Sequence, residues 1–502
     1  MPINSFGQNQ PDSLIDKNQK EIKEINGFVM DSAQNTPLPY ANIYVLHSNK
    51  GMISNEQGQF SILSKGLQAN DTLRFQYIGY ATKKIRLSDL DSSAIVYLTE
   101  KITDLSEALV FGNAPNPESI VKKVLLYKDS NYKRTDYSKE QTFIREKENV
   151  DFTNVRLGYE KSTIPGLDKA MFQELEDRVP EHTTSYTDFL GDVYFSKNKK
   201  DSIRRKVNEI RTVSLKEKDI DELKKFETTF EDVFKNKGEK EYWKVRSGIF
   251  ASKINDEDEP ISVEVKIDTA EETRRRLSSL NFGYKRSYSY MNDEDKWEFL
   301  HKTARYKYTL IGGTRVNGED VYIIDFIPKG RGTYRGRMYI TTSTFALIRA
   351  DYEYAPGKTG QNIHLLGIGY TETQFSGSIY FEKKNETYHL KYFSYKSGNS
   401  VSIERKFALI KKKKRVFFDK KLEEMKLDVL FALDTQESLE YLVLEDEIIS
   451  AQQFADFKQT KYMDVIYVDQ FDDSLWSGFS IIQPTQQMKE YKKQQVNYKV
   501  NL

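Results

Sequence analysis

Histidine, a side chain used for acid–base catalysis and for metal binding, occurs five times in the 502 residues. No two histidines stand two or four residues apart and no HExxH sequence occurs, so a zinc site would need side chains from distant strands. We therefore expect each histidine to be an ordinary surface or hydrogen-bonded residue. The five are His47, His182, His301, His364 and His389.

Other reactive patterns are missing or incomplete in the sequence. The chain has no cysteine, which excludes thiol nucleophiles, cysteine-ligated zinc, iron–sulfur clusters and disulfides. Residues 357–359 resemble the end of a phosphate-binding loop, but the first glycine of that motif would stand at Tyr352. The acidic residues at 256–259 and 293–295 lack the glycine of a calcium loop. The sequence therefore predicts no catalytic residue, no metal ligand and no cofactor.

Two basic clusters remain. Residues 411–415 are four lysines and an arginine, close to Phe417 and Phe418. The other cluster consists of Lys197, Lys199, Lys200, Arg204, Arg205 and Lys206. Either cluster could contact lipid phosphate or an acidic partner, although a solvated face is the simpler interpretation.

Composition limits the class of protein further. The chain has 76 Lys and Arg residues against 75 Asp and Glu residues. This balance argues against nucleic-acid binding, which depends on neutralised phosphates. A mean hydropathy of -0.67 and a charged fraction of 30% leave no apolar run of about 20 residues. No membrane-spanning helix is therefore expected, and the length suggests two to four domains.

The first ten residues, MPINSFGQNQ, are too few and too polar for the apolar part of an export signal. Residues 5–8 nevertheless resemble the small-residue end of such a signal in envelope proteins of the Bacteroidota type. Two interpretations of residues 1–21 stay open: a disordered start, or the remainder of an export segment whose beginning is missing.

Residues 22–100 follow the two-residue period of short, half-buried strands. Apolar side chains alternate with polar ones at residues 41–46 and 73–77, and turn residues recur at regular spacing between such runs. This rhythm predicts a small antiparallel sandwich. Gly58 and Gly79 are expected in turns that need a positive φ.

A recurring set of residues runs through this stretch: Ile25, Gly27, Val29 and Asp31, then Thr36-Pro37-Leu38, Ala41-Asn42-Ile43, Gly51, Ser54-Asn55-Glu56, Gly58, Phe60, Ile62 and Tyr77-Ile78-Gly79-Tyr80. With these residues the stretch resembles the carboxypeptidase-regulatory-like domain. The resemblance implies a transthyretin-like, seven-strand β-sandwich over residues 22–110, without peptidase activity, that acts as an extracytoplasmic spacer or docking module. Such modules commonly precede outer-membrane proteins, which implies a periplasmic or outer-membrane-associated location if the export signal was truncated.

Residues 111–134 are predicted to form a linker and a helix. Asn116 can cap the helix, Pro117 suits its first position, and Glu118 faces the positive end of the helix dipole. The helix is expected to end before residues 129–131.

Residues 135–502 are predicted to form a large curved antiparallel β-region with helical inserts. Asn317-Gly318 and Lys384-Asn385 are expected hairpin turns. In residues 345–354 the apolar side chains share one face, while Arg349, Asp351 and Glu353 are expected to face water.

Helices are expected at residues 216–235 and 484–491, and residues 422–433 fit a helix or a strand equally well. Residues 318–328, 336–340 and 344–347 are similar to the half-barrel of periplasmic lipoprotein carriers, although Thr341 stands where an acidic residue is usual.

The sequence thus predicts a mainly β protein with a few helices. The leading hypothesis is a non-enzymatic cell-envelope binding or assembly protein. Its sandwich would dock, and the aromatic concave face or a strand edge of its β-region would bind an outer-membrane or periplasmic protein or a lipid-like ligand. Two alternatives stay open: a hydrolase whose distant carboxylates or histidines meet in the fold, and a subunit of an outer-membrane protein complex.

Overall fold

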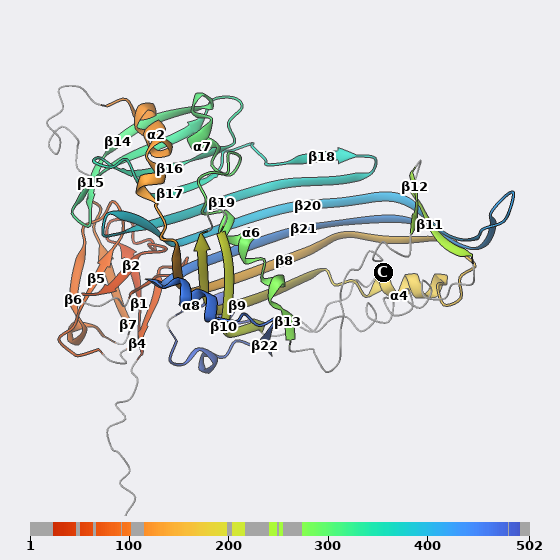
Figure 1. Cartoon of the computed structure of the whole chain (residues 1–502), viewed down its shortest axis with the longest axis horizontal. Helices are drawn as coiled ribbons and strands as arrows, with labels where there is room; N and C mark the ends of the chain where they lie inside the picture. Colours follow the sequence, from red (N-terminus) through yellow and green to blue (C-terminus); the bar gives the residue numbers. More distant parts are fainter. Residues whose placement is uncertain are drawn as a thin grey trace, which may run out of the picture.

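The computed structural model describes residues 24–46, 51–63, 67–91, 93–101, 115–197, 203–215, 240–247, 250–254, 274–479 and 481–491 (Figure 1). The predicted linker before residue 115 and the predicted helix at 216–235 lie outside these residues, as does His47. None of the helices among these residues has the length and hydrophobicity of a membrane-spanning segment.

The N-terminal sandwich, residues 24–101, consists of two small sheets with strand orders β4-β1-β7 and β3-β2-β5-β6. Its seven strands confirm the predicted sandwich. Val29, Leu73 and Phe75 are fully buried between the sheets, and Gly58 and Gly79 have φ of 72° and 91°, as expected. The strands are β1 (Glu24–Asp31), β2 (Asn42–Val45), β3 (Gly51–Ile53), β4 (Gln59–Leu63), β5 (Thr72–Gln76), β6 (Lys83–Arg86) and β7 (Ser93–Leu98), with the short helix η1 (Leu87–Asp89) before β7.

Helix α2 (Pro117–Leu126) follows the sandwich and begins where it was predicted. The Asn116 side chain caps it by accepting hydrogen bonds from the amides of Glu118 and Ser119. The helix ends at Leu126, before residues 129–131 as predicted, and a separate short helix, α3 (Lys128–Asn131), follows it. The Asn131 side chain donates to the Thr344 carbonyl oxygen at 2.9 Å, so this short helix is held against the β-region.

The described strands of the remaining chain form the large sheet, whose main path is β13-β22-β10-β9-β8-β21-β20-β19-β17-β16-β15-β14. Its pairs are antiparallel except for β10 and β22. The longest strands run from the sandwich to the opposite end of the molecule (Figure 1). The central strands are β8 (Tyr137–Ser162), β9 (His182–Lys197), β10 (Ile203–Leu215), β19 (Ile368–Lys384), β20 (Thr387–Lys413) and β21 (Lys420–Ile448). The others are β11 (Glu241–Ser247), β12 (Phe250–Ile254), β13 (Arg274–Arg276), β14 (Tyr306–Val316), β15 (Glu319–Pro328), β16 (Tyr334–Thr341), β17 (Leu347–Tyr354), β18 (Asn362–Leu365) and β22 (Tyr462–Val468).

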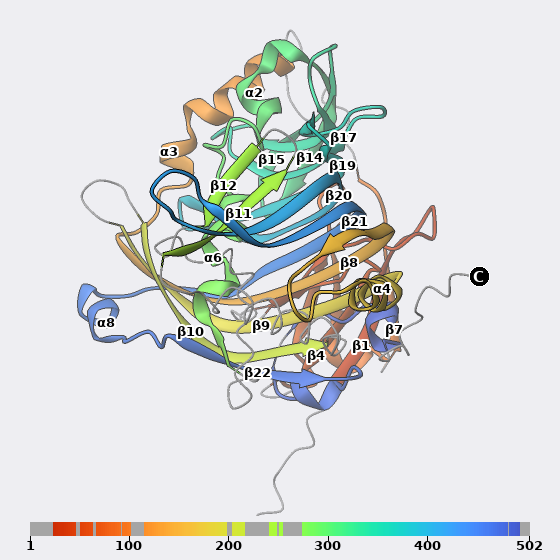
Figure 2. The same ribbon diagram turned by 90° about the vertical axis from the view of Figure 1, so that its right-hand side faces the viewer.

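Short helices border the large sheet. Viewed along the strands, the sheet is curved, and α6 lies on its inner side (Figure 2). Helix α9 begins after Thr485, whose side chain caps it, and confirms a closing helix near Pro484. The helices are α4 (Lys169–Asp177), η2 (Leu277–Leu280), α6 (Phe282–Ser287), α7 (Glu298–His301), η3 (Thr303–Arg305), α8 (Ala451–Asp456), η4 (Asp473–Trp476) and α9 (Gln486–Lys489).

Both predicted hairpin turns are present. Asn317 and Gly318 have φ of 50° and 88° between β14 and β15, and Asn385 has a φ of 56° between β19 and β20. The ambiguous residues 422–433 lie within strand β21. Residues 425–433 pair with β20 on one side and with β8 on the other, which explains why this segment is a strand.

The prediction of a solvated face on β17 was wrong at Arg349. Its side chain is buried, with 5% of its surface exposed. Its guanidinium donates to the Tyr77 hydroxyl at 2.9 Å, lies 4.5 Å from the centre of the Tyr77 ring, and pairs with Asp351 at 2.8 Å. The sandwich covers this part of the sheet, which the alternation within β17 alone could not indicate.

Candidate binding cleft between the sandwich and the large sheet

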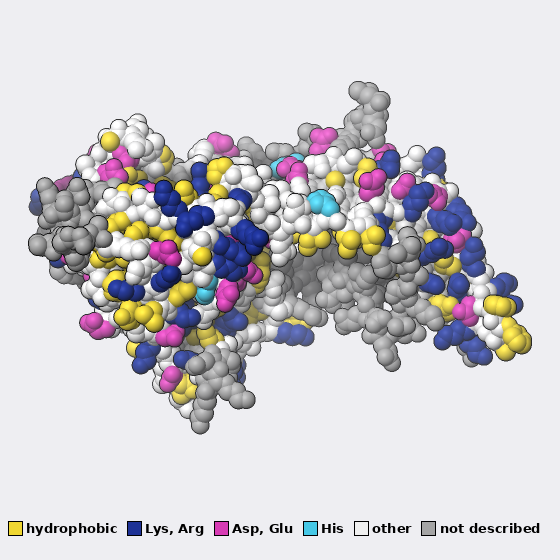
Figure 3. All heavy atoms as spheres, turned by 90° about the horizontal axis from the view of Figure 1, so that it is seen from above, with side chains coloured by type: hydrophobic (Ala, Val, Ile, Leu, Met, Phe, Trp, Pro, Cys, Tyr) yellow, Lys and Arg dark blue, Asp and Glu magenta, His cyan; other side chains and the backbone are white. Residues whose placement is uncertain are grey.

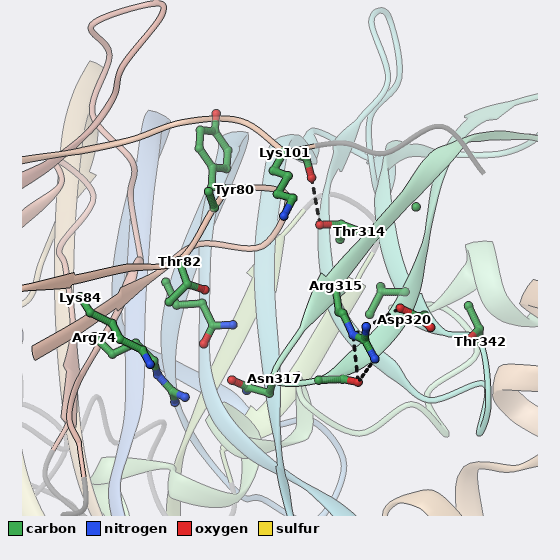
Figure 4. Close-up of a pocket in the computed structure, with 15 residues that line it drawn as sticks. Arg74, Tyr80, Thr82, Lys84, Lys101, Thr314, Arg315, Asn317, Asp320 and Thr342 are labelled. Atoms are coloured by element: carbon green, nitrogen blue, oxygen red, sulfur yellow. Dashed lines mark hydrogen bonds and ion pairs between the residues drawn. The ribbon is translucent and has the colours of Figure 1, made fainter. Parts of the chain in front are cut away.

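A cleft of about 740 Å³ lies between the sandwich and the β14–β15 hairpin (Figure 4). Its described lining comes from two parts of the chain that are distant in sequence. The sandwich contributes Arg74, Gln76, Tyr80, Ala81, Thr82, Lys84 and Lys101; the large sheet contributes Gly313, Thr314, Arg315, Asn317, Gly318, Asp320, Val321 and Thr342.

Strand alternation places the first two lining side chains. Leu73 and Phe75 point into the core of the sandwich, so Arg74 and Gln76 on the same strand point the opposite way, toward the large sheet. On the facing side, the turn at Gly318 places Arg315 and Asp320 directly opposite each other in the β14–β15 ladder, with their side chains on the same face. The Thr314 hydroxyl joins the two sides by donating to the Lys101 carbonyl oxygen at 3.1 Å.

Positive charge dominates the lining. It contains four cations, Arg74, Lys84, Lys101 and Arg315, and one carboxylate, Asp320. Arg315 is already engaged, because it lies 3.6 Å from the Asp320 carboxylate and donates to the Gly318 carbonyl oxygen at 3.2 Å. Among the described residues, the other three cations have no ion-pair partner, so the cleft favours an anion.

Two polar atoms in this lining are buried without a hydrogen-bond partner in the described structure. They are Nε of Arg74 and Oε1 of Gln76. Buried polar atoms are normally paired, so unpaired ones call for water or a ligand. Arg74 also lies over the Tyr44 ring, 5.0 Å from its centre, which holds the guanidinium near the cleft.

The cleft can hold an anion, but its described lining offers little for catalysis. It contains no histidine, and its one carboxylate is paired with Arg315. A general base needs a free acceptor within hydrogen-bond reach of the proton it removes. The arrangement therefore fits binding.

The described histidines lie apart, each with a hydrogen-bond partner, as expected for ordinary histidines. His182 bridges Asp151 and Thr184 at 2.5 and 2.7 Å. The other partners are the Met291 carbonyl oxygen for His301, the Thr371 hydroxyl for His364, and Thr387 with Asp446 for His389. Burial lowers the pKa of His389. No three potential metal ligands meet among the residues that the structure describes.

In the basic cluster at residues 197–206, one lysine is engaged in packing within the protein. The Lys206 ammonium donates to the carbonyl oxygens of Phe454 and Phe457 at 2.5 and 2.8 Å and lies over the Phe454 ring. Lys199 and Lys200 lie outside the described residues. In the basic cluster at residues 411–415, Lys411 is buried beside Glu241 and Glu423, whereas residues 414–418 are exposed.

The aromatic inner face of the sheet is covered by α6 and the residues beside it. The Tyr288 ring stacks on Tyr395 at 4.4 Å, and Phe282 packs against Phe195 and Tyr441. Because α6 covers them, these rings belong to the hydrophobic core and do not line an open groove on the inner face of the sheet. The large number of aromatic residues in the sequence could not distinguish the two cases.

One carboxyl group of strongly raised pKa lies outside the cleft. Burial raises the pKa of Glu440 to about 7, and its Oε1 has no hydrogen-bond partner. The sandwich lies against this region of β20 and β21, with Tyr40 on Tyr392 at 4.6 Å and Glu56 paired with Lys396 at 2.5 Å. Sequence reasoning did not find Glu440, because its burial results from this long-range contact.

Comparisons with known proteins agree with the sandwich. Residues 25–110 match the family model of the CarboxypepD_reg-like domain. No curated protein matches the chain.

Solved structures with a distant likeness include the MucA/MucB complex of Pseudomonas aeruginosa, at 7% identity and a TM-score of 0.16, covering 67% of this chain and 100% of that one. A putative outer membrane lipoprotein-sorting protein domain from Vibrio parahaemolyticus has 7% identity and a TM-score of 0.19, covering 68% and 97%. A DUF1329 family protein from Desulfovibrio piger has 8% identity and a TM-score of 0.19, covering 68% and 98%. Likenesses of this size carry no argument about function.

Proposed function

We propose that this protein is a non-enzymatic binding protein of the cell envelope that holds an acidic segment of a periplasmic or outer-membrane protein in the cleft. The cleft itself carries the proposal: three of its cations have no ion-pair partner among the described residues, and they face a space bordered by two buried polar atoms that lack a hydrogen-bond partner there. The carboxylates of an acidic segment would pair with the cations and accept a hydrogen bond from Arg74 Nε, and its backbone N–H groups would supply the donor that Gln76 Oε1 needs. The division into a docking sandwich at residues 22–110, a linker and helix at 111–134 and a β-region at 135–502 is part of this proposal.

The polarity of the lining favours an acidic protein segment over a lipid chain. Apart from its cations, the described lining consists largely of hydroxyl and amide side chains, and Ala81 and Val321 are its only aliphatic residues. An acyl chain would need an apolar wall. A peptide segment with carboxylate side chains matches hydroxyl, amide and cationic groups.

An envelope location is supported by the match of residues 25–110 to the CarboxypepD_reg-like domain and by the resemblance of the sequence to envelope modules. Fractionation of cells into cytoplasm, periplasm and membranes tests this part. Recovery of the native protein from the cytoplasm alone would refute it.

A reporter placed at the cleft tests ligand binding. Because the chain has no cysteine, Thr342→Cys gives a single site, at one end of the lining, for an environment-sensitive fluorophore (Figure 4). The probe ligand is octa-glutamate. We expect a saturable fluorescence change whose Kd weakens at least about tenfold when Arg74 and Lys84 are both changed to Gln, since each contributes a charge-assisted contact.

The matched control changes two exposed lysines far from the cleft, Lys307→Gln and Lys458→Gln, which removes the same total charge. It should leave the Kd within about twofold, because exposed charges more than a Debye length away are screened. An absent signal, or an equal loss in both variants, would refute the cleft as the binding site.

A further inference from the structure

The tip of the β20–β21 hairpin, residues 414–419, exposes three consecutive apolar side chains. Val416, Phe417 and Phe418 have exposed fractions of 93%, 88% and 88%, higher than those of the other large exposed hydrophobic residues of the described chain. Aromatic side chains at such exposure lose the stabilisation that burial gives. These three side chains do not pack into the hydrophobic core of the chain.

Cations surround these apolar residues. Residues 411–421 contain seven lysines and arginines and one carboxylate, Asp419. That carboxylate accepts a hydrogen bond from the Tyr242 hydroxyl at 2.5 Å. Lys411, Lys413 and Lys421 have carboxylates within 4.0 Å, whereas Lys412, Lys414, Arg415 and Lys420 have none among the described residues.

The large sheet holds the tip away from the rest of the molecule. Figure 1 shows the hairpin at the end of the longest strands, opposite the sandwich. Strand β11 pairs with β20 through Lys413, and the Lys414 amide donates to the Lys240 carbonyl oxygen at 2.9 Å, so the strands are braced up to the base of the tip. In Figure 3 the hydrophobic atoms at this extremity lie among dark blue lysine and arginine side chains.

We propose that this tip is an anchor for a lipid bilayer that contains anionic lipids. Phe417 and Phe418 enter the boundary between headgroups and acyl chains, and the cations behind them contact headgroup phosphates. An acidic protein would match the cations alone and would leave the apolar apex in water. A bilayer surface matches both features: its acyl chains accommodate the apolar apex, and its headgroup phosphates lie at the level of the cations behind the apex.

Flotation with vesicles tests the anchor. The full chain is mixed with vesicles of phosphatidylcholine alone or with 30 mol% phosphatidylglycerol, on the order of the anionic content that gives a strong surface potential. We expect binding to the anionic vesicles, at least about tenfold weaker for the double variant Phe417→Ser and Phe418→Ser. Lys412→Gln with Lys414→Gln should weaken it about tenfold or more.

The β18–β19 turn supplies a matched control for the apolar variant. Leu365 and Leu366 are 65% and 52% exposed, and no lysine or arginine occurs between residues 359 and 372. Leu365→Ser with Leu366→Ser should leave vesicle binding within about twofold. Equal losses in the two double variants would contradict a specific anchor.

A second measurement reports insertion directly. The native tryptophans Trp243, Trp297 and Trp476 are buried, so Phe417→Trp adds an exposed one. Its emission should shift to the blue with anionic vesicles and be quenched by brominated acyl chains. The anchor is refuted if the full chain does not float with anionic vesicles, if brominated lipid leaves this tryptophan unquenched, or if the phenylalanines prove to mediate association between copies of the chain.

Discussion

Single residues tie the large sheet to the C-terminal segment. Arg145 on β8 donates to both carboxylate oxygens of Asp188, at 2.8 and 2.7 Å, and to the carbonyl oxygens of Ile482 and Gln483. Arg145 and Asp188 are both buried. A buried charge that loses its partner is costly, so this contact is more consequential than the many surface ion pairs.

Changing Arg145 to Met is expected to lower the free energy of unfolding by about 3 to 5 kcal/mol, because Asp188 is left buried and uncompensated. Urea denaturation measures it. The matched control is Arg335→Met, which removes a half-exposed pair with Glu353 and should cost at most about 1 kcal/mol. Similar losses in both variants would show that the Arg145 pair is not a structural tie.

Glu440 predicts a pH dependence of stability. Burial raises its pKa to about 7, above the ordinary value of 4.5, so between these values the unfolded chain releases a proton that the folded chain keeps. The contribution of Glu440 to the free energy of unfolding is therefore full below about pH 4.5 and falls until about pH 7.

The variant Glu440→Gln has no ionisable group at this position, so its free energy of unfolding does not include the decrease that ionisation of Glu440 causes as the pH rises. Relative to the unchanged protein it should be more stable by about 1 to 3 kcal/mol at pH 8 and equally stable at pH 4. Denaturation at a series of pH values checks this, with the half-exposed Glu353→Gln as control. A stability difference that does not change with pH would contradict the burial of this carboxyl group.

At the scale of elements, two turns of the sandwich differ in what surrounds them. Gly58 and Gly79 both have positive φ, but a Cβ on Gly58 would stand 2.6 Å from the Val29 carbonyl oxygen, whereas one on Gly79 would meet nothing within 4 Å. The Gly58 carbonyl oxygen also accepts from the Val29 amide at 2.8 Å. The first turn is therefore constrained by space as well as by its backbone angles.

Gly79→Ala should lower the free energy of unfolding by about 1 to 2 kcal/mol, the cost of a left-handed backbone for alanine. Gly58→Ala should cost at least about 3 kcal/mol, because the β1 backbone must also move. Thermal unfolding of the two variants gives the comparison, and equal costs would contradict the close approach at Gly58.

The elements were largely predictable, since local patterns determine them. Alternation predicted the strands around residues 43 and 75, Asn-Gly predicted the β14–β15 turn, and the Asn116-Pro117 pair predicted the start of α2. Local patterns failed where distant parts meet. Arg349 has the alternation of a solvent-facing residue, yet Tyr77 of the sandwich covers it.

At the scale of the whole molecule, the candidate site depends on the same long-range contact. Nothing in the sequence relates Arg74 and Lys84 to Arg315, and the cleft exists because the sandwich rests beside the β14–β15 hairpin. The sequence did draw attention to residues 411–415 and the phenylalanines beside them. It could not show that the hairpin presents them at the end of the molecule opposite the sandwich.

A charge exchange tests the binding cleft most directly. Arg74 and Lys84 are both changed to Glu in the Thr342→Cys reporter, and the labelled full chain is titrated with octa-glutamate and with octa-lysine. The proposed cleft predicts that the exchange weakens the binding of octa-glutamate at least about tenfold and creates saturable binding of octa-lysine. Unchanged affinity for octa-glutamate, with no response to octa-lysine, would contradict it.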